Sequence, residues 1–245
     1  MIAKTPCYFN WLSKDLGIAH IRQKEFGKVI SSSPKWFVDL RKGIITFGEK
    51  EFPVSFLGSE SYASNTWLWG WVNVNDYAES VWKDSETFYQ RCMMMNMEEL
   101  REPELELTDI INGHALASMA VVSNQDQNRR IYANALESSA GIIPNEERMC
   151  YYKAPYDGGA AFFLIKNVPN EIFDFVPALS AFTAISEIIS SFPVHHGYLV
   201  DGIMEVFAKE VEKNGKTVLG TFYDGSVLSV EFDDNFRIKK MDNLT

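Results

Sequence analysis

A run of short strand-like segments between positions 35 and 73 constrains the fold more than any other feature of the sequence. In the first of them, apolar residues recur at every second position, as at Trp36, Val38 and Leu40. Four segments follow one another, separated by turns that contain glycine or serine: residues 35–40, 44–47, 52–56 and 65–73. A period of two predicts strands, because strand side chains alternate between two faces. The short connections then predict an antiparallel meander.

Helical periodicity flanks this meander. Residues 8–29 carry apolar side chains at spacings of three and four, and Pro34 ends the pattern. Residues 76–100 carry a second apolar stripe, which Pro103 breaks. Thr108 is of the residue type that caps helices, so we expect it to begin a further helix. The helices between residues 76 and 123 are expected to cover one face of the sheet.

The C-terminal part of the sequence also alternates between helices and strands. The turn signal at 155–159 joins two predicted strands, residues 150–153 and 161–165. Helices are predicted at residues 171–191 and 198–213, the second capped by Asn214 and Gly215. The dipeptide Asp224-Gly225 suits a type I′ turn between two further strands. These strands and one more form a predicted three-stranded meander: residues 217–223, 226–232 and 236–240.

These elements predict an α+β fold, in which antiparallel meander sheets pack against several helices. A chain of 245 residues with 46% hydrophobic and 23% charged residues is neither disordered nor fibrous, and it suits one domain or two. We expect residues 1–167 to form a core of helix, meander and covering helices. Residues 168–245 either extend this domain or form a second one.

Charge and cysteine content restrict the environment and the partners. The formal net charge of −10 argues against binding to a nucleic-acid backbone. The sequence shows no signal peptide and no apolar run of membrane-spanning length, so we expect no membrane association. The cysteines Cys7, Cys92 and Cys150 are widely spaced and odd in number, which favours a reducing compartment. The expected location is the cytoplasm.

Residues 66–73 read Thr-Trp-Leu-Trp-Gly-Trp-Val-Asn. This tract resembles the signature of a bacterial family of uncharacterised proteins, whose members carry a Trp-x-Trp-x-Trp-x-Asn strand. Residues 113–117, 151–155 and 157–165 agree with the same family, and the resemblance covers roughly residues 20–167. It implies a small cytosolic domain of unknown function, and it implies no catalytic residue.

The side chains of Trp67, Trp69, Trp71 and Asn73 are expected to share one face of a strand. Three indoles in a row either form a stacking platform for a ligand or pack in the core under the helix at 76–100. The core interpretation is favoured because large aromatic residues are usually buried. Gly70 on the opposite face would then admit another backbone. Each buried indole needs a hydrogen-bond acceptor, so one of the three can still line a pocket.

Three histidines are further candidates for binding or acid–base chemistry. His114 shares a helical stripe with Ile111 and Ser118, so we expect a half-buried histidine whose hydrogen bonds are satisfied within the fold. A role as general base would require a carboxylate or a substrate within reach. His195 and His196 are adjacent, so their side chains diverge and serve one metal ion poorly. The sequence shows no third ligand and no known metal motif, and we therefore expect no metal and no cofactor.

The sequence also lacks a nucleophile elbow, a P-loop and a Rossmann fingerprint. We therefore expect an intracellular binding or interaction protein without catalytic activity, such as one that neutralises a basic protein partner. Five glutamates in residues 98–106 could face such a partner. The alternative is a small-molecule-binding domain or enzyme with a pocket near residues 67–73 and a histidine as acid or base. A deep cavity in which a histidine and a carboxylate converge beside an indole would favour this alternative, which fails if both histidine sites lie far from any cavity. Homo-oligomerisation is a further option.

Overall fold

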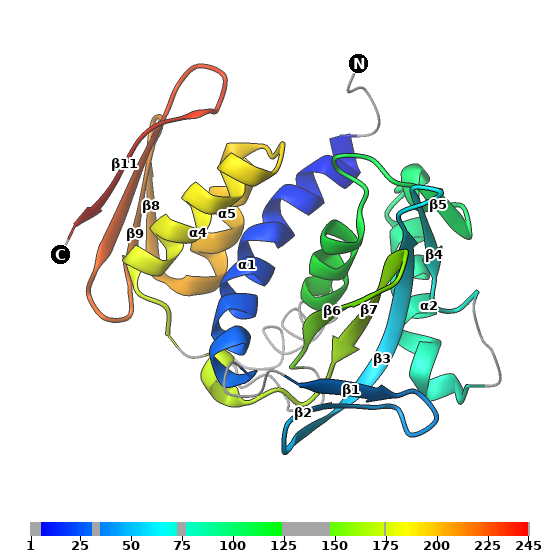
Figure 1. The fold of residues 1–245 in the computed structure, drawn as a ribbon. Coiled ribbons are helices and arrows are strands. Elements are labelled where there is room, and N and C mark those ends of the chain that lie inside the picture. Colours follow the sequence, from blue (N-terminus) through cyan, green and yellow to red (C-terminus); the bar gives the residue numbers. More distant parts are fainter. Residues whose placement is uncertain (1–5, 31–34, 73–76, 124–147, 174, 245) are drawn as a thin grey trace. The chain divides into compact units, whose positions relative to one another are not determined.

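The computed structural model describes residues 6–30, 35–72, 77–123, 148–173 and 175–244. Its contacts divide the chain into two compact units (Figure 1). Unit 1 contains Met1–Arg22 and Phe173–Thr245, and unit 2 contains Gln23–Ile172. Helix α1 (Pro6–Ile30) contributes its first part to unit 1 and its last part to unit 2. Helices and antiparallel sheets are combined in the chain, so the predicted α+β class is confirmed.

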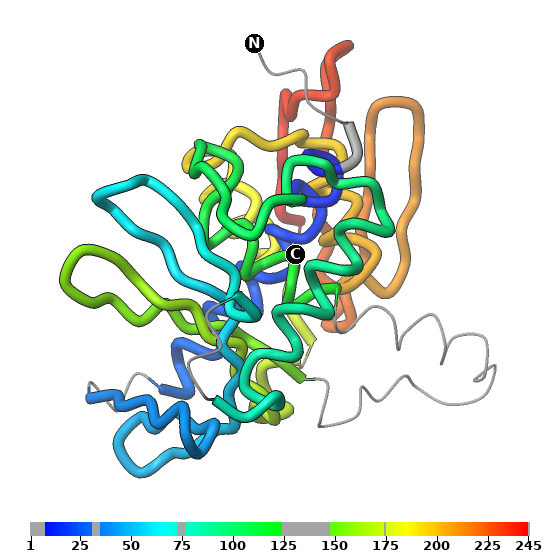
Figure 2. The backbone as a smooth tube through the Cα atoms, turned by 90° about the vertical axis from the view of Figure 1, so that its right-hand side faces the viewer, coloured from blue at the N-terminus to red at the C-terminus, as the bar shows by residue number. Residues whose placement is uncertain are grey.

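Within the described residues, unit 2 is built on an antiparallel sheet of seven strands. Five strands lie in the order β1-β2-β3-β4-β5, while β7 pairs with β3 and β6 pairs with β7. Figure 2 shows the β3–β4 and β6–β7 hairpins next to one another. The strands are β1 (Trp36–Asp39), β2 (Ile44–Phe47), β3 (Lys50–Ser61), β4 (Thr66–Trp69), β5 (Glu104–Glu106), β6 (Cys150–Tyr156) and β7 (Gly159–Ile165). The predicted meander and the hairpin of β6 and β7 are therefore confirmed.

Strand β3 is longer than the sequence pattern indicated, and β4 is shorter. The pairing of β3 with β7 shifts register between Phe56 and Gly58, which marks a bulge. A bulge inserts one residue and breaks the period of two, so the alternation could be followed only to Phe56. Strand β4 ends at Trp69, and Gly70 donates a backbone hydrogen bond to the carbonyl of Leu57 (2.8 Å). A Cβ at Gly70 would lie 2.0 Å from the carbonyl oxygen of Phe56, so the predicted close backbone approach is confirmed.

Two helices and one short strand of unit 2 differ from the prediction. The helix predicted over 76–100 is divided into α2 (Glu79–Met94) and the 3₁₀ helix η1 (Glu98–Leu100). The division occurs at Asn96, whose φ of 55° ends helical geometry. The next helix covers residues 113–123, and its cap is Asn112 instead of Thr108, because the Asn112 side chain accepts from the amide of Ala115 (3.0 Å). Strand β5 was not predicted, because its three residues are too few to show the alternation of apolar and polar side chains that indicates a strand.

After β7, three helical elements follow one another before the second sheet. They are the 3₁₀ helix η3 (Asn170–Phe173), α4 (Ala178–Ser191) and α5 (His196–Phe207), with η3 reaching back across the unit boundary. The helix predicted over 171–191 begins only after Pro177, which is the N-cap of α4. Among the described residues, no helix is long and apolar enough to cross a membrane.

The sheet of unit 1 has one strand more than predicted. Within the described residues its order is β11-β10-β9-β8, all antiparallel, with β8 (Ala208–Asn214), β9 (Thr217–Phe222), β10 (Val227–Phe232) and β11 (Ile238–Leu244). The prediction of one helix over 198–213 was wrong, because the chain leaves α5 at Phe207 and pairs with β9. Asn214 and Gly215 accordingly belong to a hairpin turn, in which Gly215 has a φ of 60°.

The β9–β10 turn is the predicted hairpin, but its type differs. Gly225 has a φ of 86°, whereas Asp224 is not in the left-handed region that a type I′ turn requires. The carboxylate of Asp224 instead accepts a hydrogen bond from the amide of Ser226 (3.0 Å). The amide of Gly225 donates to the carbonyl of Phe222 (3.0 Å). Asp224 therefore stabilises the turn through its side chain and needs no left-handed backbone.

Candidate functional site

Two of the three tryptophans form part of the interior of unit 2. Trp67 and Trp69 are 0% exposed, and their rings meet edge to face at 5.8 Å. Trp69 also packs against Phe88 of α2 (5.9 Å), as the core interpretation predicts. Its indole nitrogen donates to the carbonyl of Glu102 (3.2 Å). The core interpretation is therefore confirmed for these two rings, and neither presents a face on which a ligand could stack.

Trp71 and Asn73 lie beyond the end of β4. Trp71 is half-buried, and its ring packs against Tyr89 of α2 at 4.9 Å. Asn73 lies outside the described residues. The indole nitrogens of Trp67 and Trp71 are buried and have no hydrogen-bond partner within the described part of the chain. A binding role for Trp71 and Asn73 stays a prediction.

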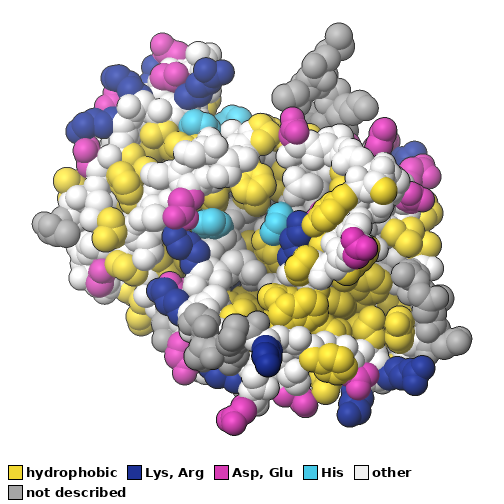
Figure 3. Space-filling model, viewed as in Figure 1, with side chains coloured by type: hydrophobic (Ala, Val, Ile, Leu, Met, Phe, Trp, Pro, Cys, Tyr) yellow, Lys and Arg dark blue, Asp and Glu magenta, His cyan; other side chains and the backbone are white. Residues whose placement is uncertain are grey.

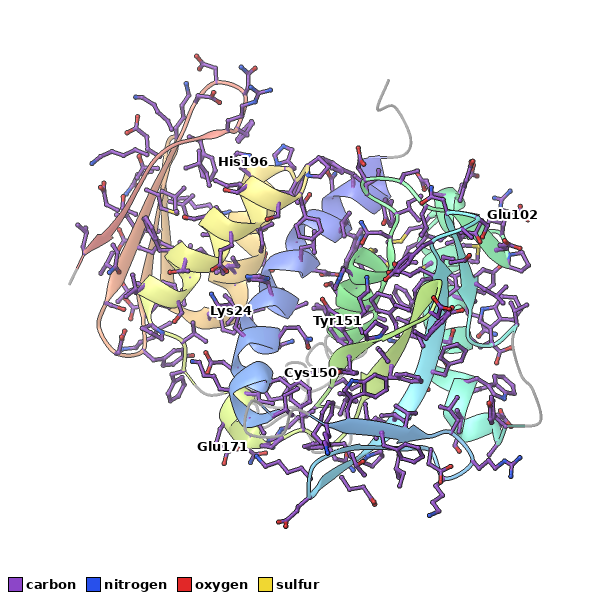
Figure 4. All side chains as sticks on the ribbon, viewed as in Figure 1. Lys24, Glu102, Cys150, Tyr151, Glu171 and His196 are labelled. Carbon is purple, nitrogen blue, oxygen red and sulfur yellow. The ribbon has the colours of Figure 1, made fainter. Side chains whose placement is uncertain are left out.

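His195 and His196 belong to unit 1, where His195 is the N-cap of α5. His196 is the first residue of that helix (Figure 4). The side chain of His195 caps the helix by accepting a hydrogen bond from the amide of Tyr198 (3.3 Å). The side chain of His196 accepts from the amide of Ile238 in β11 (3.1 Å). Burial, followed by the nearby His195 and Arg237, lowers the pKa of His196. The two side chains thus diverge, and each stabilises local structure.

His114 lies at the start of the helix at 113–123, in unit 2. Its Nδ1 is 3.3 Å from the hydroxyl of Tyr151, at the start of β6 (Figure 4). The imidazole meets the ring of Phe162 edge to face at 5.5 Å. Ser118, one turn further along the helix, also hydrogen-bonds to Tyr151. Two elements, the helix at 113–123 and β6, thus bring polar side chains to the phenyl ring of Phe162 in β7.

An ion pair between a buried carboxylate and a partly exposed ammonium lies against the same phenyl ring. Glu60 of β3 is only 5% exposed, and its Oε1 is 2.5 Å from the Nζ of Lys153 in β6. Lys153 lies directly opposite Phe162 in the sheet, and its Nζ is 5.5 Å from the centre of that ring. Glu60 lies directly opposite Trp67. Because opposite residues share one face of a sheet, the ion pair and the indole lie on the same face. We call Glu60, His114, Ser118, Tyr151, Lys153 and Phe162 the His114 cluster.

Gly113 allows the helix at 113–123 to begin beside the carboxylate of Glu60. A Cβ at this position would lie 2.3 Å from the ring of Phe162 and 2.9 Å from Oε2 of Glu60. Any larger residue would therefore separate the start of the helix from the sheet. The first turn of a helix carries a partial positive charge, which stabilises a nearby carboxylate. Glycine at 113 thus lets the helix end and Lys153 both neutralise Glu60.

The pKa shifts in the cluster keep its imidazole and phenol uncharged at neutral pH. Burial, followed by the charge of Lys153, lowers the pKa of His114, and the charge of Glu60 offsets only part of this effect. Burial raises the pKa of Tyr151 to about 12. Burial alone would lower the pKa of Lys153, but its hydrogen bond to Glu60 and the charge of Glu60 outweigh burial and raise it. The charges of Glu60 and Lys153 compensate each other, so the cluster is close to neutral.

Two exposed tyrosines lie beside the cluster at the hairpin ends. Tyr62 is 57% exposed, follows β3, and donates its amide hydrogen to the carbonyl of Gly158 (2.9 Å). Tyr156 is 52% exposed, ends β6, and its hydroxyl donates to the carbonyl of Glu60 (3.4 Å). The Nζ of Lys153 is 5.6 Å from the centre of the Tyr62 ring. Tyr62 therefore lies next to the ion pair, whereas Tyr156, which pairs with Gly159, lies on the opposite face of the sheet from Lys153.

Of the residues predicted to form a site, the structure places only His114 in this cluster. Glu60 was missed because it falls within the stretch after residue 58 that was predicted to be a turn. Tyr151 and Lys153 were noticed as part of a predicted strand and of the family resemblance, and not as site residues. His114 and Glu60 lie near an indole, since the Phe162 ring packs on Trp67 at 5.4 Å, but the predicted site also requires a cavity there, so it stays a prediction. In the described residues, no group of three or more histidine, cysteine or acidic side chains could hold a metal ion.

A cavity of about 310 Å³ lies elsewhere, in unit 1. Its lining is Asp201, Met204, Glu205, Val211 and Lys213. Lys213 forms an ion pair with Asp201 (2.7 Å), and both side chains are exposed. None of the predicted histidines lines this cavity, so it is separate from the candidate residues.

Comparison with protein families finds a match over most of the chain. A model described as a family of unknown function (DUF6882) matches residues 10–168. The matched segment contains the tryptophan tract and the whole His114 cluster, and it ends before α4. No curated protein and no solved structure matches the chain.

Proposed function

The chain belongs to the DUF6882 family of unknown function, and we propose that it is a small-molecule-binding domain whose ligand contacts the His114 cluster. The observation that carries this proposal is the half-buried imidazole of His114. Its Nδ1 is held by Tyr151, and its Nε2 makes no hydrogen bond within the described residues. A neutral imidazole fixed at one nitrogen presents the other to a ligand.

The surroundings of His114 support the same proposal. Ligand sites typically combine an apolar or aromatic lining with a few precisely placed polar groups. Here Phe162 supplies the aromatic surface, while the side chains of Glu60 and Lys153 are held within 2.5 Å of each other. Titratable groups with shifted pKa values also concentrate at functional sites. Both His114 and Tyr151 have shifted pKa values.

A thermal-shift screen of the full chain tests this proposal. The compounds should include sugars, amino acids, nucleotides, carboxylic acids and inorganic anions. A ligand that binds only the folded chain raises the melting temperature. We expect at least one class to stabilise the wild type and to lose most of its effect with His114→Gln. His20→Gln is the control, because His20 pairs with Glu187 (2.7 Å) in unit 1. Absence of any stabilising compound, or equal stabilisation of His114→Gln, would contradict the proposal.

Protein binding is a second candidate, favoured by the exposed aromatic end of the large sheet. Strand β1 pairs only with β2 within the described residues, and it carries the exposed residues Trp36 and Phe37. Hydrophobic side chains gather over the β1–β3 part of the sheet (Figure 3). An unpaired apolar edge strand is a template for another strand. The net charge of −10 would favour a basic partner.

Affinity capture with matched baits tests this second candidate. We expect a specific basic protein to bind the wild type and Tyr223→Lys but not Phe37→Lys. Tyr223 is an exposed tyrosine of unit 1, so its replacement introduces the same charge in the other unit. Equal capture by all three baits would show that β1 is not the interface.

A further inference from the structure

We infer that two copies of this chain form a symmetric dimer, in which strand β11 of one copy pairs with β11 of the other. Within the described residues β11 pairs only with β10, so it forms one edge of the sheet of unit 1 (Figure 1). A free strand edge is a template for another strand. The interface belongs to unit 1, so it is independent of the proposed ligand site, which lies in unit 2.

Met241 presents its backbone hydrogen-bonding groups at this free edge. The amide of Phe232 donates to the carbonyl of Lys216, just before β9 (2.9 Å). Because the backbone groups of successive strand residues point to opposite sides, the neighbouring Glu231 points towards β11, where it pairs with Lys240. Met241, the next residue, therefore directs its N–H and C=O away from β10. Two copies of Met241 placed opposite each other can exchange two hydrogen bonds.

The charges on β11 fit a register centred on Met241. A two-fold axis that pairs a strand with itself places one residue opposite its own copy. With Met241 at the axis, Lys240 of each copy lies opposite Asp242 of the other, and such opposite charges stabilise a sheet. With Lys240 or Asp242 at the axis, like charges would face each other instead. A register centred on Asn243 would place Asp242 opposite the apolar Leu244.

The opposite edge of the same sheet lacks this complementarity. Strand β8 pairs only with β9 among the described residues. Val211 points its backbone groups to that edge, because its partner Gly220 directs its own towards Leu228 in β10. A two-fold axis at Val211 would place Glu210 of one copy opposite Glu212 of the other, which destabilises a sheet. The charges therefore favour β11 over β8 as the self-pairing edge.

Helix α4 would extend the same interface. It packs against β10 and β11. On one flank of α4, Glu187 pairs with His20 of α1 (2.7 Å), whereas Phe182 and Ile189 lie on the other flank and are partly exposed. Strands lie about 4.8 Å apart, so two helices that each cover β10 and β11 would lie roughly 10 Å apart across the axis, which is a helix-packing distance. The α4 helix of the second copy would then cover these apolar side chains.

Sedimentation equilibrium of the full chain tests the inference, at concentrations between about 1 and 300 µM, which cover weak and moderate dimers. We expect the wild type to pass from monomer to dimer over this range. Met241→Pro removes an amide at the free edge without breaking a hydrogen bond to β10, and it should weaken the dimer about tenfold or more. The matched control is Val211→Pro, which removes the corresponding amide of β8 and should leave the dimer unchanged.

Charge reversal tests the register with variants that keep the backbone intact. Lys240→Glu and Asp242→Lys each place like charges opposite each other, so each should weaken the dimer about fivefold or more. The double variant restores opposite charges and should restore the dimer. An ion pair that acts only within one chain, where the two side chains are 2.5 Å apart, would not affect the oligomeric state. Far-UV circular dichroism establishes that each variant is folded before dimer affinities are compared.

Four outcomes would overturn the inference. The first is a wild type that stays monomeric over the whole range. The second is a dimer that neither Met241→Pro nor the charge reversals weaken, because it would use another surface. The third is a loss in the single reversals that the double variant does not restore, since the two charges would then not face each other. The fourth is an open series of larger species, which pairing of β11 with β8 of the next copy would produce.

Discussion

At the scale of single residues, His114 is expected to make the stability of the folded chain depend on pH. The pKa of His114 is lowered in the folded chain by burial and by Lys153, and Glu60 only partly opposes this. Below the ordinary histidine pKa of about 6.5, the unfolded chain therefore binds more protons at this position than the folded chain does. The contribution of neutral His114 to the stability of the folded chain is fully present above about pH 6.5. It is lost as the pH falls through the lowered pKa that His114 has in the folded chain. We expect the free energy of unfolding to decrease on acidification.

Urea unfolding at pH 7.5 and pH 5.5 measures this effect. The decrease should be smaller in His114→Gln, which has no titrating group facing Glu60, Tyr151 and Lys153. His196 also has a lowered pKa, so some pH dependence should persist in the variant. An NMR titration of the His114 ring should give a midpoint below 6.5. A midpoint above 6.5, or an unchanged pH dependence in the variant, would refute the lowered pKa.

Because Glu60 is more deeply buried than Lys153, we expect replacement of Lys153 to cost more stability than replacement of Glu60. Lys153→Met leaves a carboxylate that is 5% exposed without its cation, and we expect a loss of about 2–4 kcal/mol. Glu60→Gln should cost about 1–2 kcal/mol, since Lys153 is 29% exposed and can reach water. The double variant should be more stable than the sum of the two losses indicates, as a double-mutant cycle would show. Strict additivity would mean that the two groups do not interact.

Residue identity alone predicted burial better than it predicted the site. Trp67 and Trp69 were expected in the core because large aromatic side chains gain most from leaving water. Glu60 could not be found in this way, since a glutamate is almost always exposed unless it is paired. Its partner Lys153 is 93 positions away in the sequence, on another strand. Only the pairing of β3 with β7 and of β7 with β6 brings the two together.

At the scale of secondary-structure elements, α2 is attached to the sheet through Ser85. Its buried hydroxyl donates to the carbonyl of Leu57 (2.6 Å), at the bulge of β3, and accepts from the amide of Gly70 (3.1 Å). Ser85→Ala removes both hydrogen bonds in a buried place, and we expect a loss of about 1–3 kcal/mol in chemical denaturation. Ser80→Ala, at an exposed position of the same helix, should change stability by less than about 0.5 kcal/mol. Equal effects of the two changes would rule out the anchoring role.

Elements were predictable where one period continued and were misjudged where the period changed. Strand β2 alternates along its whole length and has its predicted bounds. Strand β7 is a continuous apolar run, and it begins two residues before the predicted strand. Helix α5 ends at Phe207 and strand β8 begins at the next residue, Ala208. No glycine or proline marks this change from helix to strand. Strand β8 is exposed along almost its whole length, so it has no apolar alternation to distinguish it from a helix. Its structure depends on pairing with β9, a tertiary effect that local propensity does not contain.

At the scale of the whole molecule, the N-terminal helix belongs to the same compact unit as the C-terminal residues. Unit 1 combines Met1–Arg22 with Phe173–Thr245, although 150 residues of unit 2 lie between them in the sequence. The contacts are close: a Cβ at Gly17 would lie 2.7 Å from the side chain of Ile203. The guanidinium carbon of Arg22, which is itself buried, is 5.1 Å from the centre of the Phe173 ring. Such pairing of sequence-distant segments cannot be inferred from local patterns.

This arrangement predicts that residues 168–245 do not fold without the N-terminal helix. Leu199 and Ile203 of α5 are fully buried, and both lie within 3 Å of a Cβ placed at Gly17. Removing the helix would expose these side chains, at a cost of roughly 1.5–3 kcal/mol for each. That loss is large beside the few kcal/mol that stabilise a domain of this size. We expect the isolated fragment to show no cooperative thermal transition by circular dichroism.

Fusing residues 1–22 to this fragment through a flexible glycine–serine linker should restore a cooperative transition. The matched control carries the same fusion with Gly17→Phe, whose ring cannot fit against Ile203 and Leu199. Restoration by the first fusion and not by the second would establish that packing of the helix, and not chain length, completes unit 1. A fragment that unfolds cooperatively on its own would instead identify residues 168–245 as an independent domain. In that case the family-matched segment could function without it.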